Sequence, residues 1–214
     1  EYELLDGTMQ NNITFKEKRA TADRVPLWHK ENCIQCNQCA FVCPHATIRP
    51  FVLNDEQIAK LPEDEREDVL NLMGGPNTKG LKFRIQVSPM NCVGCGICFV
   101  QCPGKGGKKA LEMVEAKTQY HHEKAADILY KETESRTDLF PLNTVKGAAF
   151  LPAYQEVSGA CAGCGETPYY RLVSQLFGKD MLVANATGCS SIYNGSTPLT
   201  AFVTDKNGEG VAWA

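Results

Sequence analysis

The feature that most constrains this chain is a cysteine run that occurs twice. The run reads C-x2-C-x2-C-x3-C-P, once at residues 33–44 and again at residues 92–103. Three thiolates spaced by two residues wrap one [4Fe–4S] cluster, whereas the fourth cysteine lies beyond a short helical turn and serves the other cluster. The two runs therefore complete each other. We expect cluster I to be held by Cys33, Cys36, Cys39 and Cys102, and cluster II by Cys92, Cys95, Cys98 and Cys43.

Other uses of cysteine fit this spacing less well. A zinc site needs four ligands, and two runs of four that each end in Cys-Pro do not have the spacing of a zinc ribbon. Disulfides require an oxidising compartment, and the first residues lack the basic and then apolar pattern of a secretion signal. Haem attachment needs C-x-x-C-H, which the sequence does not contain. The pattern therefore indicates iron–sulfur clusters in a reduced interior.

Composition and charge argue against two classes of partner. Hydrophobic residues make up 43% of the 214 residues, which is enough for a core, and no apolar run is long enough to span a membrane. The formal net charge is −3, and ligated clusters add further negative charge, which disfavours a nucleic-acid partner. We expect neither a membrane nor nucleic acid as a partner.

The patterning around the two runs divides the chain into four segments. We expect a connecting arm at residues 1–24, a ferredoxin-type domain at 25–114 with a helical insertion at 53–80, a linker at 115–155, and a further α/β segment at 156–214. Within the ferredoxin-type domain, apolar runs predict strands at residues 25–28, 46–52, 81–87 and 110–114. Strand, cluster turn and strand, repeated twice, give an α+β bicluster ferredoxin-like fold.

Local signals refine some of these elements. Pro50 cannot donate to a strand ladder, so strand 46–52 is expected at a sheet edge. Apolar and polar residues alternate along 81–87, which predicts a half-buried strand. Helix-favouring residues predict helices at residues 55–60, 63–73 and 118–131. His121 and His122 lie on the last of these, where we expect surface side chains rather than metal ligands.

Two charged stretches have a plain and a functional interpretation. The acidic residues between positions 55 and 68 are expected to form a solvated helical face rather than a docking site. Lys105, Lys108 and Lys109 follow the second cysteine run, where a solvated loop is the simpler interpretation and attraction of an acidic electron acceptor is the alternative.

A third cysteine set lies in the last segment. Cys161 and Cys164 sit in a glycine-rich loop that runs into a predicted helix, with Thr167 suited to the N-cap and Pro168 to the first turn. That helix carries one apolar stripe, formed by Tyr169, Leu172, Val173, Leu176 and Phe177. A buried parallel strand is expected at residues 181–184, and Cys189 follows it. Spacing alone leaves open a cluster that lacks one ligand, or a C-x2-C redox pair beside a buried free thiol.

The chain resembles the central to C-terminal part of the pyruvate:ferredoxin (flavodoxin) oxidoreductases, a family of thiamine-diphosphate enzymes. The matching stretches are residues 31–45, 91–104, 158–169 and 186–191, and together they extend over most of the chain. The resemblance implies that residues 156–214 begin an α/β thiamine-diphosphate-binding domain. It also implies that Cys161, Cys164 and Cys189 hold a third [4Fe–4S] cluster, completed by a cysteine outside this chain. Glu166 and Cys189 would lie against thiamine diphosphate, which the full enzyme binds with Mg²⁺.

The resemblance further implies a function. Such an enzyme oxidatively decarboxylates pyruvate to acetyl-CoA and CO₂, and passes electrons through three clusters to ferredoxin or flavodoxin. The implied partners are pyruvate, coenzyme A, the remaining domains of the same polypeptide and a second subunit in a homodimer. The implied compartment is the cytoplasm of an anaerobic bacterium, or a hydrogenosome in a eukaryote.

Parts of the family pattern are missing from these residues. The Gly-Asp-Gly segment that holds Mg²⁺ and diphosphate and the pyruvate pocket do not occur here. We therefore expect an incomplete piece that does not turn over alone, and we assign no catalytic residue within it. Two alternatives stay open: a non-catalytic bicluster electron carrier fused to an unrelated α/β module, and an oxidoreductase for another 2-oxoacid.

Overall fold

The computed structural model describes residues 10–75, 77–195 and 200–213, and the first nine residues of the expected connecting arm lie outside this description. The chain forms two compact units. We call residues 20–43 and 47–151 the cluster unit, because they contain both cysteine runs. The other described residues, 10–19, 44–46, 152–195 and 200–213, form the C-terminal unit.

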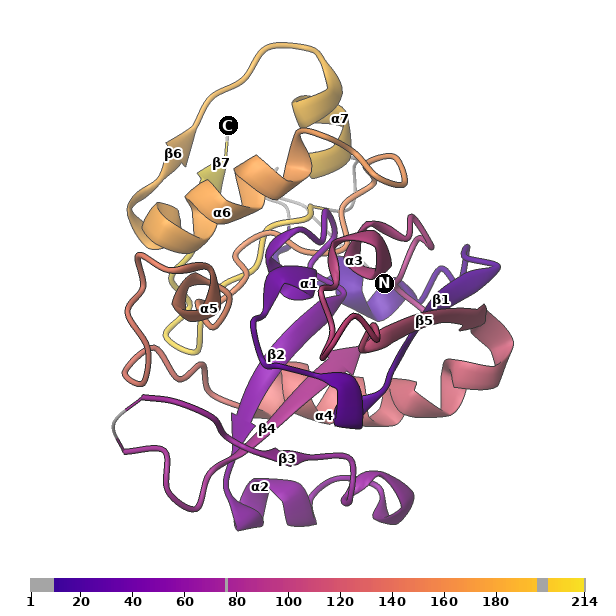
Figure 1. Ribbon diagram of the computed structural model, residues 1–214. Helices are drawn as coiled ribbons and strands as arrows, with labels where there is room; N and C mark the ends of the chain where they lie inside the picture. The colour runs from indigo at the N-terminus through magenta and orange to yellow at the C-terminus, as the bar shows by residue number, and fades with distance from the viewer. Residues whose placement is uncertain (1–9, 76, 196–199, 214) are drawn as a thin grey trace. The chain divides into compact units, whose positions relative to one another are not determined.

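Two antiparallel sheets, each built around one main strand pairing, form the β-structure in the described part of the cluster unit (Figure 1). Its strands are β1 (Arg24–Trp28), β2 (Ile48–Leu53), β3 (Leu70–Asn71), β4 (Lys82–Val87) and β5 (Leu111–Glu115). Strand β1 pairs with β5, and β2 pairs with β4. Each pairing joins one strand from each half of the cysteine repeat, so the four predicted strands are confirmed. Strand β2 lies at the edge of the order β2-β4-β3, as Pro50 requires.

Short helices carry the cysteine runs and the segments around them. The helices and 3-10 helices of this unit are η2 (Lys30–Asn32), α1 (Gln38–Phe41), α2 (Asp55–Ala59), η3 (Glu63–Glu65), α3 (Ile97–Gln101), η4 (Ala116–His122), α4 (Glu123–Glu132) and α5 (Val145–Ala148). Helix α1 contains Cys39, and α3 contains Cys98. The main core combines Ile48, Phe83 and Leu111 of the strands with the buried Cys43 and Cys98.

The insertion contains less helix than the sequence predicts. Helix α2 forms as expected, because Asn54 and Gln57 close a capping box at its start. The helix predicted at residues 63–73 is wrong: the chain makes only the short η3 and then strand β3, which pairs with β4. Pairing with the free edge of β4 outweighs the helix propensity of this segment, as tertiary contacts often do.

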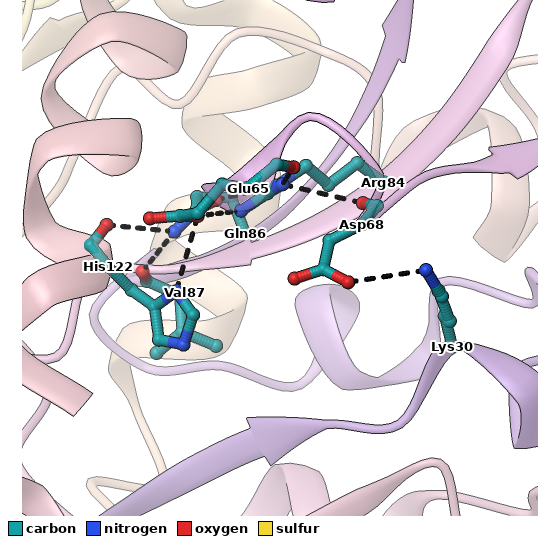
Figure 2. A network of polar contacts seen from close by, with 7 residues as sticks. All are labelled: Lys30, Glu65, Asp68, Arg84, Gln86, Val87 and His122. Atoms are coloured by element: carbon teal, nitrogen blue, oxygen red, sulfur yellow. Dashed lines mark hydrogen bonds and ion pairs between the residues drawn. The ribbon is translucent and has the colours of Figure 1, made fainter. Parts of the chain in front are cut away.

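Strand β4 is buried on both faces, so the half-buried prediction is wrong. Arg84 and Gln86 are only 3% and 2% exposed. Figure 2 shows the reason: Arg84 forms an ion pair with Glu65, and its Nε donates to Gln86 Oε1 at 2.8 Å. Burial tends to raise the pKa of Glu65, but the hydrogen bond from His122 and the charge of Arg84 hold it below its usual value.

The segment expected to be a linker packs within the cluster unit. The helix predicted at residues 118–131 is α-helical only in α4, and its first part belongs to the 3-10 helix η4. Ala125 and Leu129 of α4 are fully buried against Leu53 and Leu61. His122 Nδ1 lies 3.2 Å from Glu65 Oε2, so only His121 has the exposed position that we expected of both histidines.

The C-terminal unit has mixed α/β structure. Its elements are η1 (Thr14–Glu17), α6 (Thr167–Phe177), η5 (Gly178–Asp180), β6 (Leu182–Val183), α7 (Cys189–Asn194) and β7 (Ala212–Trp213). Strand β6 is parallel to β7, as predicted, but it is not buried, since Leu182 is 88% exposed. The N-cap of α6 is Glu166, one residue before the predicted Thr167.

Helix α6 presents its apolar stripe outward. Tyr169 is 74% exposed and Phe177 is 59% exposed, whereas Arg171 and Ser174 are buried. The α6 residue that packs against the small core of Tyr154, Phe202 and Val211 is Tyr170, which does not belong to the stripe. In the described residues of both units, no helix is both long and apolar enough to cross a membrane.

Candidate metal centre

The four cysteines predicted to hold cluster I line one cavity in the cluster unit. The lining of this cavity includes Cys33, Cys36, Cys39 and Cys102. Apolar side chains such as Trp28, Ile85 and Leu111 complete the wall. The two halves of the repeat thus contribute thiols to the same space, with three from the first run and one from the second.

Backbone N–H groups point at two of these sulfurs. The amide of Gln35 lies 3.4 Å from Cys33 Sγ, and that of Ala110 lies 3.3 Å from Cys102 Sγ. Burial raises the pKa of the Cys33 and Cys39 thiols, and nearby thiolates raise it further, including Cys36 beside Cys33 and Cys98 of the second run beside Cys39. Thiolates held together in this way need a positive partner, which the irons of a cluster provide. The donor set therefore fits a [4Fe–4S] cluster.

The second predicted group is also brought together, in a more buried place. Cys43, Cys92 and Cys98 are buried, and Cys95 is half-buried. Burial raises the pKa of Cys92 to about 12, with contributions from the charges of Cys43 and Cys95. Burial and the same neighbours also raise the pKa of Cys98. The amide of Gly94 lies 3.4 Å from Cys92 Sγ, which repeats the Gln35 contact of the first group.

All eleven cysteines lie within the described residues, and none forms a disulfide. Across residues 10–75, 77–195 and 200–213, no group of three or more His, Cys, Asp or Glu side chains is arranged to hold a single metal ion. Thiols that surround a cavity suit a cluster of several irons, whose ligands stand farther apart than those of one tetrahedral ion.

The turns that place the cysteines depend on left-handed backbone. We call residues 33–39 loop 1 and residues 92–98 loop 2. In loop 1, Gln35 has φ 56° and Asn37 has φ 60°; in loop 2, Gly94 has φ 70° and Gly96 has φ 74°. The two loops therefore follow the same path with different residues, and this path turns amides toward the sulfurs.

Buried amide side chains fix loop 1. Gln35 Nε2 donates to Asn71 O at 2.8 Å, and Gln35 Oε1 accepts from Met73 N at 2.8 Å. Asn37 Nδ2 donates to Lys146 O at 3.0 Å. Gln35 and Asn37 are 1% and 2% exposed, so these bonds are shielded from water. Sequence reasoning missed both residues, and a signal was available, since Gln and Asn replace the two glycines of loop 2.

A carboxylate fixes the approach to loop 2. Glu123, the first residue of α4, accepts from Ser88 Oγ at 2.7 Å and from Met90 N at 2.9 Å. Ser88 N in turn donates to Thr47 O at 2.8 Å, beyond Cys43. Loop 2 is thereby tied to the end of the first cysteine run.

The three lysines after the second run have different roles. Lys109 Nζ donates to the carbonyls of Phe99, Val100 and Cys102 at 2.8–3.0 Å, so it caps the end of α3. The solvated-loop interpretation is wrong for Lys109, because its ammonium serves these carbonyls. Lys105 and Lys108 are exposed and face each other across a tight turn.

The third cysteine set lies in the C-terminal unit. Cys164 N donates to Cys161 O at 3.0 Å within one turn. Burial tends to raise the pKa of Cys164, but the N–H groups of Thr167 and Glu166 at the start of α6 lower it below the usual value. Cys189 is the exposed first residue of α7, which is joined to the same loop because Tyr193 O accepts from Gly159 N at 3.4 Å.

Two further residues lie against this loop. Burial raises the pKa of the Tyr193 phenol, and the negative charge of Glu166 raises it further, so the two side chains are near neighbours. His45 is 1% exposed, and its Nε2 lies 3.3 Å from Cys161 O. His45 O also accepts from Val157 N at 2.9 Å. Sequence reasoning assigned no role to His45, and the Cys-Pro-His order gave no reason to connect it with residue 161.

Comparison with known proteins agrees with this geometry. A family model described as a 4Fe-4S dicluster domain matches residues 32–106. The chain is 47% identical over 210 residues to a pyruvate:ferredoxin oxidoreductase of Moorella thermoacetica, and 44% identical over 211 residues to a pyruvate-flavodoxin oxidoreductase of Klebsiella pneumoniae. Each alignment covers 98% of this chain and 17% of the relative.

A eukaryotic relative shows the same relation. The chain is 42% identical over 207 residues to the mitochondrial pyruvate dehydrogenase (NADP(+)) of Euglena gracilis, which covers 97% of this chain and 11% of the relative. The chain thus spans less than a fifth of the length of these relatives.

Proposed function

Since the chain is homologous, along nearly its whole length, to a segment of the pyruvate:ferredoxin and pyruvate-flavodoxin oxidoreductases, we propose that it is the electron-delivery segment of such an enzyme. The enzyme oxidatively decarboxylates pyruvate to acetyl-CoA and CO₂. Electrons pass through this segment to ferredoxin or flavodoxin. The observation that carries the proposal is the crossing of the two cysteine runs, which places four thiols around the cavity of cluster I.

The cluster unit supplies the ligands and surroundings of two [4Fe–4S] clusters. Each cluster, when bound, accepts and releases one electron at a time. Cys33, Cys36, Cys39 and Cys102 hold cluster I, and Cys92, Cys95, Cys98 and Cys43 hold cluster II. The amides of Gln35, Gly94 and Ala110 hydrogen-bond the sulfurs and stabilise their negative charge. The apolar wall keeps water away from the thiolates.

The C-terminal unit supplies part of a third site. We assign Cys161, Cys164 and Cys189 to a third [4Fe–4S] cluster, completed by a cysteine from elsewhere in the polypeptide. The lowered pKa of Cys164 supports this assignment, because a ligand must be a thiolate. Glu166 and Cys189 would contact thiamine diphosphate, which would supply the electron sink for loss of CO₂. Glu166 is suited to orient a ligand, since it starts α6 and neighbours the buried Tyr193.

The remaining partners follow from the whole enzyme. Pyruvate and coenzyme A bind to domains outside these residues, and a second subunit completes a homodimer. The reduced thiols suit the cytoplasm of an anaerobic bacterium or a hydrogenosome.

The experiment is a metal count followed by a turnover assay on the full-length protein, purified without oxygen. About twelve irons and as many acid-labile sulfides per chain are expected, four for each cluster. Pyruvate with coenzyme A is expected to reduce ferredoxin, and 2-oxoglutarate or a branched-chain oxoacid serves as the control substrate. About eight irons without pyruvate turnover would instead identify a bicluster carrier. Zinc at these sulfurs, or faster turnover of a control substrate, would overturn the proposed cofactor or the proposed substrate.

A further inference from the structure

We propose that Lys146 is a positioning residue whose ammonium raises the reduction potential of cluster I relative to that of cluster II. This proposal rests on the proposed function, because it requires that clusters I and II are both bound. Lys146 belongs to α5, in a segment that the sequence predicts to be a linker.

The backbone of Lys146 is held against loop 1. Helix α5 packs beside α1, which carries Cys39 (Figure 1). Asn37, which lies between Cys36 and Cys39, donates from its buried Nδ2 to Lys146 O at 3.0 Å. This contact fixes the start of α5 at the turn that presents these two thiols.

The ammonium of Lys146 is fixed as well. Lys146 Nζ donates to Met73 O at 2.7 Å and lies 4.2 Å from the centre of the Phe140 ring. Met73 N donates to the side chain of Gln35, and Gln35 lies between Cys33 and Cys36. The charge is therefore held in one place by bonds that also hold loop 1.

The charge of Lys146 acts on cluster I thiolates. Burial lowers the pKa of Lys146, and the negative charges of Cys33 and Cys36 act in the opposite direction. Cys33 and Cys36 both belong to cluster I, and the hydrogen bonds of Lys146 are to Asn37 and to Met73, which also holds loop 1. Reduction adds one negative charge to a cluster, so a fixed cation stabilises the reduced form. Cluster I thus gains a stabilisation that favours electron flow toward it.

Lys109 does not produce the same difference between the reduction potentials of the two clusters. Its ammonium is surrounded by the carbonyls of Phe99, Val100 and Cys102, whose partial negative charges offset it. Helix α3, which it caps, carries Cys98 of cluster II and leads to Cys102 of cluster I. A charge at this position acts on both clusters, whereas Lys146 contacts loop 1.

The test is a redox titration of the anaerobically purified full-length protein, followed by electron paramagnetic resonance. Variants that lose one cluster, Cys36→Ala and Cys95→Ala, assign the two signals. In Lys146→Met, the ratio of reduced to oxidised cluster I at a fixed potential is expected to fall about tenfold. For a one-electron couple, this corresponds to a decrease of about 59 mV in the reduction potential. Lys146→Arg keeps the charge and is expected to stay near the wild type. Cluster II is expected to be unchanged in both variants.

The control is Lys124→Met, which removes the same charge from an exposed position on α4. An unchanged potential of cluster I in Lys146→Met would overturn the proposal, and so would equal shifts in Lys146→Met and Lys146→Arg. Lys146→Gln, which keeps a donor for Met73 O without the charge, covers the case in which the methionine variant fails to assemble cluster I. Loss of cluster I in both uncharged variants would show a structural role and also overturn the proposal. Absence of clusters in the wild type would contradict the proposed function instead.

Discussion

Loop 1 and loop 2 follow the same backbone path with different residues. Each loop has two positions with positive φ. The first position lies two residues after the first cysteine of the loop, and the second lies one residue after its second cysteine. Loop 2 has glycine at both positions, at φ 70° and 74°, whereas loop 1 has Gln35 at φ 56° and Asn37 at φ 60°. Glycine adopts this conformation at little cost, and a glutamine there carries strain of about 1 kcal/mol or more.

The difference shows where each loop obtains its stability. Loop 1 uses the side chains at its strained positions, because Gln35 and Asn37 are buried and hydrogen-bonded to residues 71–73 and to Lys146. Loop 2 uses the conformational freedom of its glycines. In addition, the carboxylate of Glu123 binds Ser88 and Met90, which lie just before the first cysteine of the loop. One loop therefore depends on the insertion and α5, and the other on its own glycines and α4.

Removal of the crossed cysteines is expected to have the largest effect. Cys102→Ala should remove cluster I and spare cluster II, although Cys102 follows loop 2 in the sequence, because Cys102 lines the cavity with Cys33, Cys36 and Cys39. Cys43→Ala should do the reverse. Each variant is expected to lose about four irons, and electron paramagnetic resonance identifies which signal is lost. Loss of the cluster II signal in Cys102→Ala would disprove the crossing.

Glu65→Gln is expected to have the next largest effect, and to act on loop 1. Glu65 is paired with the buried Arg84, which also donates to the carbonyls of Glu65 and Asp68, just before β3. Breaking such a buried pair costs about 3–5 kcal/mol. We expect urea unfolding of the cluster-loaded protein to show this loss, and hydrogen exchange to be faster in loop 1 than in loop 2. Glu123→Gln is the matched variant and should affect loop 2 instead.

The same variant has a defined pH dependence. The folded-state pKa of Glu65 is lowered, so its ion pair contributes stability at pH values above the unfolded pKa, and this contribution is lost as the pH falls through the folded pKa. The stability difference between wild type and Glu65→Gln should therefore shrink as the pH falls below about pH 4. A difference that grows below about pH 4 would contradict the lowered pKa.

Exchanging residues between the loops should give the smallest effects, and unequal ones. A Cβ at Gly94 would lie 2.9 Å from Arg24 O and 3.0 Å from Ala22 Cβ, so Gly94→Gln is expected to destabilise the protein by about 2–4 kcal/mol. A Cβ at Gly96 has no atom within 4 Å, and asparagine tolerates positive φ. Gly96→Asn should therefore cost about 1 kcal/mol or less. Anaerobic urea unfolding measures both, and equal costs would show that crowding at Gly94 is unimportant.

Much of the cluster unit could be predicted from local sequence. Cysteine spacing predicted which thiols share a cluster. The structure brings the thiols of each group near one another, and their ligation of iron stays a prediction. Apolar runs predicted the four main strands, and Pro50 predicted the edge position of β2, because a residue without an N–H cannot occupy a central strand. The roles of Glu166 and Cys189 toward thiamine diphosphate remain predictions from the family resemblance.

Other features were decided by partners far away in the chain. The helix predicted at residues 63–73 became η3 and β3, because β4 offered an edge to pair with and Arg84 a charge to bind. The polar residues Arg84 and Gln86 are buried because Glu65 pairs with Arg84 and Arg84 donates to Gln86. Lys146 lies more than a hundred residues after loop 1 in sequence, and only packing of α5 beside α1 brings its charge there.

The sequence by itself determined the two cysteine groups and the strands that carry them, because ligand spacing and side-chain alternation are local properties of the chain. The tertiary structure alone decided which polar groups are buried, which groups accept hydrogen bonds from the Gln35 and Asn37 side chains, and where the charge of Lys146 lies. Burial and hydrogen bonding depend on neighbours from distant parts of the chain, and these are fixed only when the chain has folded.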